Sequence, residues 1–192
     1  MEKQLNESST SKDRRKKKLL IFVNSNHDNI FSMINLLNHA RQAEVYLYTA
    51  LVYFCNNNFK KAQKTLSQVI IKGKTFFSLP LFRTIRLVNL MVLYEIGDFD
   101  AIQYECRSIK REFSQKESSF RTENLMLKFV NKPLNIILQE HRTKLLKKFL
   151  PELEEIRHDI FEAQMLKIFD FTAWIESKIS KKSLQNIFEE KF

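Results

Sequence analysis

Glycine and proline are scarce in this chain, which has 2 Gly and 3 Pro among 192 residues. β-Sandwiches, dinucleotide-binding sheets and loop-rich enzymes need many more turn residues, so the composition excludes these classes. Because glycine occurs only at Gly73 and Gly97, the chain has neither a phosphate-binding loop nor a dinucleotide fingerprint. The scarcity of both residues predicts an all-α protein.

Cysteine and long apolar runs are scarce as well. Cys55 and Cys106 cannot form a disulfide framework, and both lie in apolar stretches where a thiol usually packs as a small hydrophobic group. The longest uncharged apolar run, residues 45–55, is shorter than the roughly 20 residues of a membrane span. The basic residues 14–18 precede an apolar segment too short for a signal peptide. We therefore expect a soluble, cytoplasmic protein.

Acidic residues are missing from one long stretch, although the whole chain carries a net charge of +10. Between Glu44 and Glu95 there are seven basic residues and no acidic one. Five of the seven form a candidate basic patch: Lys60, Lys61, Lys64, Arg83 and Arg86. A second basic cluster, residues 12–18, lies in an expected disordered arm over residues 1–28. Such stretches attract nucleic acid, an acidic protein or an anionic membrane surface, and the alternative is a solvated helix face.

The apolar residues recur at helical spacing from about Phe31 onward. One helix is predicted to end at residues 56–58, and the next to run from Phe59 to a left-handed stop at Gly73. Ser78 and Pro80 are typical of the start of a third helix, which ends at Gly97. A fourth helix is predicted from residue 99 to about residue 113.

The two turns of this pattern lie 40 residues apart, which indicates a repeated helical hairpin. The first hairpin resembles a tetratricopeptide repeat in its small and aromatic positions: Tyr46, Ala50, Tyr53, Phe59, Ala62 and Leu66. The second copy has larger residues at equivalent positions, namely Leu90, Leu93 and Ile102. Residues 94–100 and 169–175 also resemble the closing parts of uncharacterised bacterial helical-repeat proteins. The resemblance implies a right-handed stack of antiparallel helical hairpins, an α-solenoid.

The tetratricopeptide resemblance also implies a concave groove that binds a partner. Its lining residues would be mainly apolar: Leu47, Leu51, Phe54, Leu87, Met91 and Tyr94. Members that clamp a peptide carboxylate use Lys and Asn at such positions, so an amphipathic helix is the expected occupant. The alternative is that these residues belong to the core.

The C-terminal part is expected to add a third hairpin, residues 120–130 with 134–150, and then a long helix over residues 152–180. The apolar surface of this long helix is too broad for a single stripe. It would therefore either fill the groove as a plug or form an exposed partner site. These helices complete a single helical-repeat domain over residues 29–180, and residues 181–192 form a short tail.

Catalytic and metal-binding patterns are weak. Glu155, His158 and Glu162 share one helix face at the spacing of a di-iron unit, but the second unit that such sites need is missing. We therefore expect no enzyme activity, no metal and no cofactor. The leading hypothesis is a non-catalytic protein-interaction scaffold with an acidic or amphipathic partner. The alternatives are a nucleic-acid-associated helical protein and self-assembly through the surface of residues 161–179.

Overall fold

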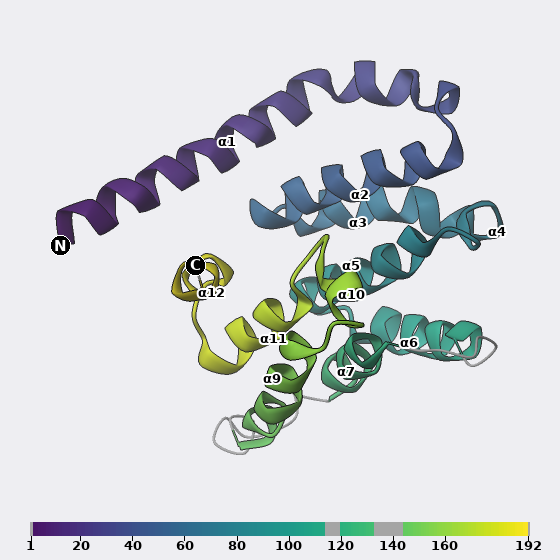
Figure 1. Ribbon diagram of the computed structural model, residues 1–192. Coiled ribbons are helices and arrows are strands. Elements are labelled where there is room, and N and C mark those ends of the chain that lie inside the picture. Colours follow the sequence, from purple (N-terminus) through teal and green to yellow (C-terminus); the bar gives the residue numbers. More distant parts are fainter. Residues whose placement is uncertain (1, 114–119, 133–143, 192) are drawn as a thin grey trace. The chain divides into compact units, whose positions relative to one another are not determined.

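The computed structural model describes residues 2–113, 120–132 and 144–191 (Figure 1). Throughout these ranges the regular structure is helical and contains no strand, which confirms the all-α class. The chain divides into two compact units, residues 1–98 and 99–192, whereas the sequence predicts one domain over residues 29–180. Each unit is described by itself. The second predicted hairpin would pair helices from different units, so the solenoid stays a prediction.

The first unit is built around a helical hairpin with a third helix packed against it (Figure 1). Its elements are α1 (Glu2–Ser32), η1 (Ile34–Leu36), α2 (His39–Cys55), α3 (Phe59–Ile71), α4 (Gly73–Phe76) and α5 (Pro80–Ile96). The turn between α2 and α3 places Asn57 at φ 58°, a left-handed conformation that asparagine tolerates. Ala50 and Ala62 are fully buried. The predicted hairpin with its turn at residues 56–58 is therefore present.

The two glycines behave differently. Gly97 ends α5 in the left-handed conformation, with φ 82°, and its N–H donates to the carbonyl of Leu93. The expected left-handed stop at Gly73 is wrong, because α3 ends at Ile71 and Gly73 is the first residue of α4. The carbonyl of Gly73 accepts a hydrogen bond from the N–H of Phe77, so the chain continues in a right-handed turn.

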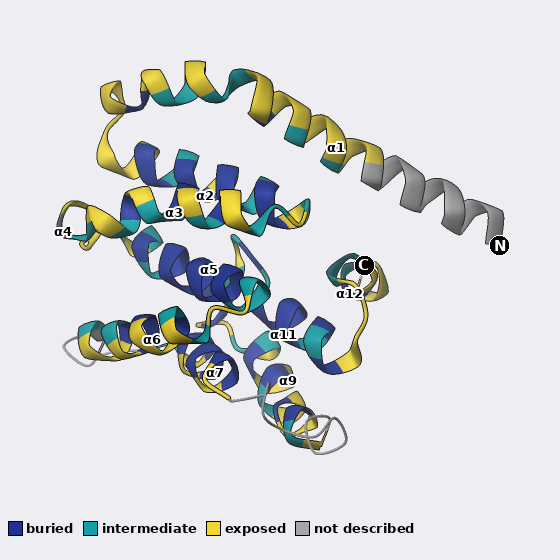
Figure 2. Cartoon of the chain, turned by 180° about the vertical axis from the view of Figure 1, so that it is seen from behind, coloured by how far each residue is buried: buried dark blue, intermediate teal, exposed yellow. Residues whose placement is uncertain are grey.

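Residues 2–32 form helix α1, where the sequence predicts a disordered arm over residues 1–28. No glycine or proline interrupts this segment, so a continuous helix can form. The ring centroids of Phe31 and Tyr46 lie 5.2 Å apart, and Val23 is buried. Most of the described surface of α1 is nevertheless exposed, in contrast to α5, most of whose residues are buried (Figure 2). The helix therefore contacts α2 through a narrow strip.

The second unit places three helices around one aromatic cluster. Its elements are α6 (Phe99–Phe113), α7 (Arg121–Val130), α9 (Leu150–His158), α10 (Ala163–Leu166), α11 (Phe171–Ser180) and α12 (Leu184–Lys191). The ring of Phe129 lies 5.6 Å from that of Trp174 and 5.4 Å from that of Phe149, between centroids. The expected partner of α7, residues 134–150, falls largely on residues 133–143, which lie outside the described residues.

The long helix expected over residues 152–180 is wrong, because this segment forms the three helices α9, α10 and α11. The chain is extended at Asp159, where α9 ends. A new helix begins after Asp170, whose carboxylate accepts a hydrogen bond from the N–H of Ala173 at 2.9 Å. The broad apolar surface therefore belongs to separate segments. Phe161 is exposed, whereas the apolar residues of α11 are buried. The predicted plug would join the two units and stays a prediction.

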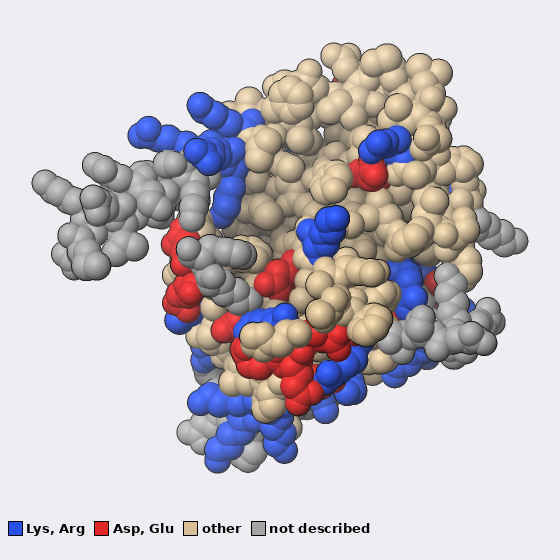
Figure 3. Space-filling model, in the orientation of Figure 1, with Lys and Arg blue, Asp and Glu red and all other residues tan. Residues whose placement is uncertain are grey.

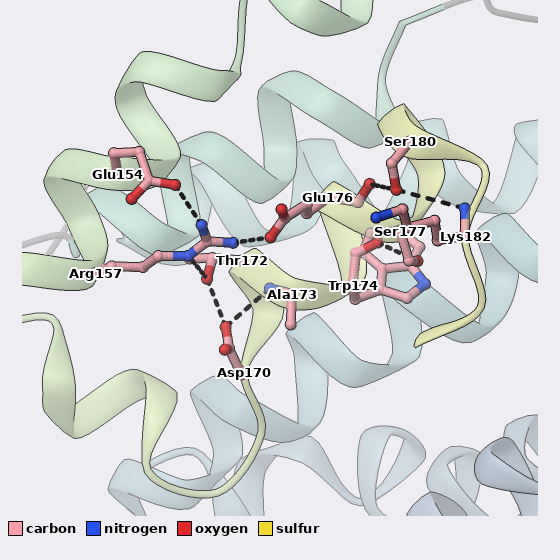
Figure 4. Close-up of polar contacts among 10 residues, drawn as sticks. All are labelled: Glu154, Arg157, Asp170, Thr172, Ala173, Trp174, Glu176, Ser177, Ser180 and Lys182. Atoms are coloured by element: carbon pink, nitrogen blue, oxygen red, sulfur yellow. Dashed lines mark hydrogen bonds and ion pairs between the residues drawn. The ribbon is translucent and has the colours of Figure 1, made fainter. Parts of the chain in front are cut away.

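Arg157 ties α9 to α11 (Figure 4). Its guanidinium forms ion pairs with Glu154 on its own helix and with Glu176 on α11. Its Nε atom also donates to the hydroxyl of Thr172 at 2.9 Å. Because only 17% of the Arg157 side chain is exposed, these charge-assisted bonds are partly shielded from water. They fix the position of α11 against α9.

Glu162 caps the N-terminus of α7, although it lies about 40 residues away in the sequence. Its carboxylate accepts hydrogen bonds from the N–H of Arg121 at 2.6 Å, the N–H of Thr122 at 2.9 Å and the hydroxyl of Thr122 at 2.7 Å. These N–H groups have no partner within their own helix, and the positive end of the helix dipole favours a carboxylate. Glu162 is only 3% exposed, so the site is a buried cap.

We expect the substitution Glu162→Ala to lower the free energy of unfolding by about 2 to 3 kcal/mol, because buried donors lose a charged acceptor. Urea unfolding followed by the fluorescence of Trp174, which is buried in the same unit, measures the change. The control is Glu155→Ala, which removes an exposed carboxylate paired with Arg121 and should cause a much smaller change. Equal effects of the two substitutions would contradict the capping role.

Candidate functional site

The six residues of the expected groove are mostly core residues. Leu47, Phe54, Leu87 and Met91 are buried, and Leu51 and Tyr94 are half-buried. Side chains that are buried within the protein are not accessible to a binding partner. The structure therefore favours the core interpretation for four of the six residues.

The five residues of the expected basic patch have different environments. Lys60, Lys61 and Lys64 are exposed on α3, and Arg83 on α5 is half-buried. Arg86 is only 3% exposed, and its guanidinium lies 5.7 Å from the centre of the Phe82 ring. The prediction that Arg86 belongs to a surface patch is therefore wrong, because its side chain is buried.

Helix α1 contacts α2 and α3 close to the exposed lysines of α3. Asn24 of α1 connects the helices, since its Oδ1 atom accepts a hydrogen bond from the Tyr53 hydroxyl on α2 and another from Lys61 Nζ on α3, both at 3.3 Å. Farther along α1, Lys16 lies close enough to the end of α2 for its charge to act on Cys55. Desolvation raises the pKa of that thiol, and Lys16 opposes the rise.

We call this region the basic surface and define it by seven exposed side chains: Arg14, Arg15, Lys17 and Lys18 on α1, and Lys60, Lys61 and Lys64 on α3. Figure 3 shows the Lys and Arg side chains gathered on α1. The first unit, which contains this surface, has 15 basic and 7 acidic residues, a net charge of +8. The second unit has 17 basic and 15 acidic residues, a net charge of +2. The excess charge of the protein is therefore concentrated in the first unit.

The start of α3 is electrostatically unfavourable. The first turn of a helix carries a partial positive charge and is stabilised by acidic residues. The first turn of α3 instead contains Lys60 and Lys61 and no acidic residue, and the side chain of its N-cap residue Asn58 makes no capping hydrogen bond. Proteins commonly keep residues that lower stability at exposed positions when those residues bind a ligand or partner. An anionic group from outside would satisfy this helix end.

Exposed apolar residues lie among the cations of α1. Leu19, Ile21 and Phe22 are 54%, 63% and 60% exposed. With 3.6 residues per turn, Ile21 and Phe22 fall on the same half of the helix as Arg14 and Lys18. Apolar and basic side chains are therefore interleaved, and the helix has no separate apolar face.

The residues with the spacing of a di-iron unit do not form a metal site in the described part of the chain. No group of three or more His, Cys, Asp and Glu side chains is placed to hold a metal ion there. Glu155 pairs with Arg121, His158 is exposed, and Glu162 is the cap of α7. The described helices also include none that is long and apolar enough to cross a membrane.

Two features of the structure are not predicted from the sequence. The cap formed by Glu162 joins residues about 40 positions apart, and no local pattern indicates it. The exposure of Cys55 at the end of α2 was also missed, because the residue follows an apolar stretch. The asparagines at 56–58 indicate the end of the helix, and they are the local signal that Cys55 lies near an exposed turn.

We expect the two thiols to differ in reactivity. Cys106 is buried, and burial raises its pKa to about 11; the charge of Lys110 opposes the rise and that of Glu105 adds to it. Desolvation also raises the pKa of Cys55, so the two thiols differ mainly in exposure, and N-ethylmaleimide at pH 8 should modify the exposed Cys55 faster. Mass spectrometry of native protein should show one rapid addition, and of denatured protein two. In the Cys55→Ser variant, a rapid addition to the native protein would contradict the prediction.

Comparison of the chain with protein-family models, curated proteins and solved structures finds no match in any of the three. The tetratricopeptide resemblance therefore stays a prediction.

Proposed function

We propose that this protein is a non-catalytic interaction protein that binds an acidic partner protein through the basic surface. The observation that supports the proposal most directly is the first turn of α3, where Lys60 and Lys61 stand at a helix end that favours negative charge. Carboxylates of a partner would offset the repulsion between these cations and the helix dipole. The net charge of +8 on the first unit adds long-range attraction for such a partner.

The exposed apolar side chains favour a protein partner over other anionic surfaces. Of Leu19, Ile21 and Phe22, only Phe22 has a flat ring on which a nucleic-acid base can stack, whereas Leu19 and Ile21 would gain most against apolar side chains. A helix that lies on a membrane needs its apolar residues on one face, whereas α1 interleaves them with cations. A partner helix that carries both acidic and apolar residues matches this surface.

The experiment that tests the function is site-specific crosslinking in lysate of the source cells. A photoreactive amino acid replaces Lys64 on the basic surface and, as a control, the exposed Lys167 in the second unit. The proposal expects a discrete protein that crosslinks at position 64, not at position 167, and persists after nuclease treatment. Crosslinking that disappears with nuclease would overturn it in favour of nucleic-acid association. In that case binding should fall steeply with salt and with deletion of residues 1–18.

The substitution Lys60→Glu should increase stability and weaken binding at the same time. An acidic residue in the first turn of α3 should raise the free energy of unfolding by about 0.3 to 1 kcal/mol. The double variant Lys60→Glu/Lys64→Glu should weaken the affinity for the crosslinked partner at least tenfold, on the order of 1.4 kcal/mol. Urea unfolding and fluorescence anisotropy measure the two effects.

The matched control is Lys147→Glu/Lys167→Glu, which makes the same change of charge at exposed lysines of the second unit. Its affinity should stay within about twofold of the unchanged protein, because a local contact is lost only at the basic surface. An equal loss of affinity in both double variants would show that net charge alone governs binding.

A further inference from the structure

The second unit has a hollow of about 640 Å³ that shares no residue with the basic surface. It is lined by one residue of α6, one of α9, and the outward side of α7 with the residues that follow it: Lys110, Glu152, Arg121, Asn124, Leu127, Lys128, Asn131 and Lys132. We call it the α7 hollow. Its volume lies within the range of small-molecule sites, roughly 300 to 1,000 Å³.

The lining of the α7 hollow is cationic. It contains four basic residues and one acidic residue, and Leu127 is its only apolar member. Arg121 pairs with Glu155 outside the lining, and Lys128 pairs with Glu152 at 3.1 Å. Within the described ranges of the chain, Lys110 and Lys132 form no ion pair. The excess of basic groups in this lining suits an anionic ligand.

The spacing along α7 explains how so many polar groups line one hollow. Arg121, Asn124, Lys128 and Asn131 recur at intervals of three and four, so they share one face of the helix. The row extends roughly 15 Å at 1.5 Å per residue. Lysines near the end of α7 also complement the helix dipole, which accounts for Lys128 and Lys132. It does not account for Lys110, which reaches the same hollow from α6.

We propose that the α7 hollow binds a phosphorylated small molecule, with Lys110 and Lys132 as the principal contacts to phosphate oxygens. Lys128 and Arg121 add to these contacts when the ligand competes with Glu152 and Glu155 for them, because such exposed ion pairs are weak. The amide of Asn131 supplies a neutral hydrogen-bond donor at the same end of the row. Phosphate suits this lining better than a single carboxylate, since it presents more charge and more acceptor oxygens to several donors.

Glu152 gives the proposal a specific consequence. Its carboxylate holds Lys128 and also repels an anion within the hollow. The substitution Glu152→Gln therefore frees Lys128 and removes the repulsion. It should strengthen anion binding, a result that a merely structural role for this residue does not produce.

Isothermal titration calorimetry with inorganic tripolyphosphate tests the site on the full chain. The background variant Lys60→Glu/Lys64→Glu reduces binding at the basic surface. Lys110→Ala and Lys132→Ala should each weaken binding at least fivefold, and Glu152→Gln should strengthen it about threefold. The matched controls are Lys167→Ala and Glu190→Gln, which change the same charges outside the hollow and should leave the affinity within about twofold.

Two results of these titrations would contradict a phosphate site in the α7 hollow. Equal losses in Lys132→Ala and Lys167→Ala, or no tripolyphosphate binding at about 1 mM, would overturn the proposal. Further titrations with a nucleotide and with vesicles containing a phosphorylated lipid distinguish a free ligand from a membrane headgroup. Because the crosslinking experiment concerns α3, the proposed function and the α7 hollow can fail independently.

Discussion

A buried carboxylate needs hydrogen-bond donors, and the N–H groups of Arg121 and Thr122 in the first turn of α7 donate to that of Glu162. The chain must turn back after α9 for this side chain to reach Thr122, which is incompatible with one continuous helix over residues 152–180. The same turn places α11 beside α7 and α9, where Trp174 meets Phe129. Arg157 then joins α9 to α11 through Glu176. The aromatic core of the second unit is thus arranged around one capping interaction.

The first unit follows a different principle, since its stability and its surface chemistry are in conflict. Packing of α2, α3 and α5 relies on buried apolar residues and on two alanines in the hairpin. The exposed start of α3 carries lysines where the helix dipole favours carboxylates, and α1 adds further cations. Local rules of stability are usually broken where a protein binds something. The two units therefore carry their candidate sites in different ways, one on exposed helix surfaces and one in a hollow.

Residue patterns that depend only on near neighbours were readable in the sequence. The helix end at residues 56–58, the stop at Gly97 and the boundaries of α6 and α7 follow from local spacing and from turn residues, and the structure has them at those places. The environments of individual side chains were harder to predict. The sequence predicts a surface position for Arg86 and an apolar environment for Cys55, but Arg86 is buried and Cys55 is exposed. Helical periodicity identifies a face but does not say what covers it.

The sequence by itself determined the all-α class, the first hairpin and the concentration of positive charge before residue 98, because these depend on composition and on contacts between neighbours in the chain. Only the tertiary structure decided that the C-terminal segment breaks into three helices, since the carboxylate of Glu162 is satisfied about 40 residues away. It also decided that the helical row on α7 faces a hollow shared with Lys110 and Glu152. Side chains from three helices define that hollow, and their proximity depends on packing that no local pattern encodes.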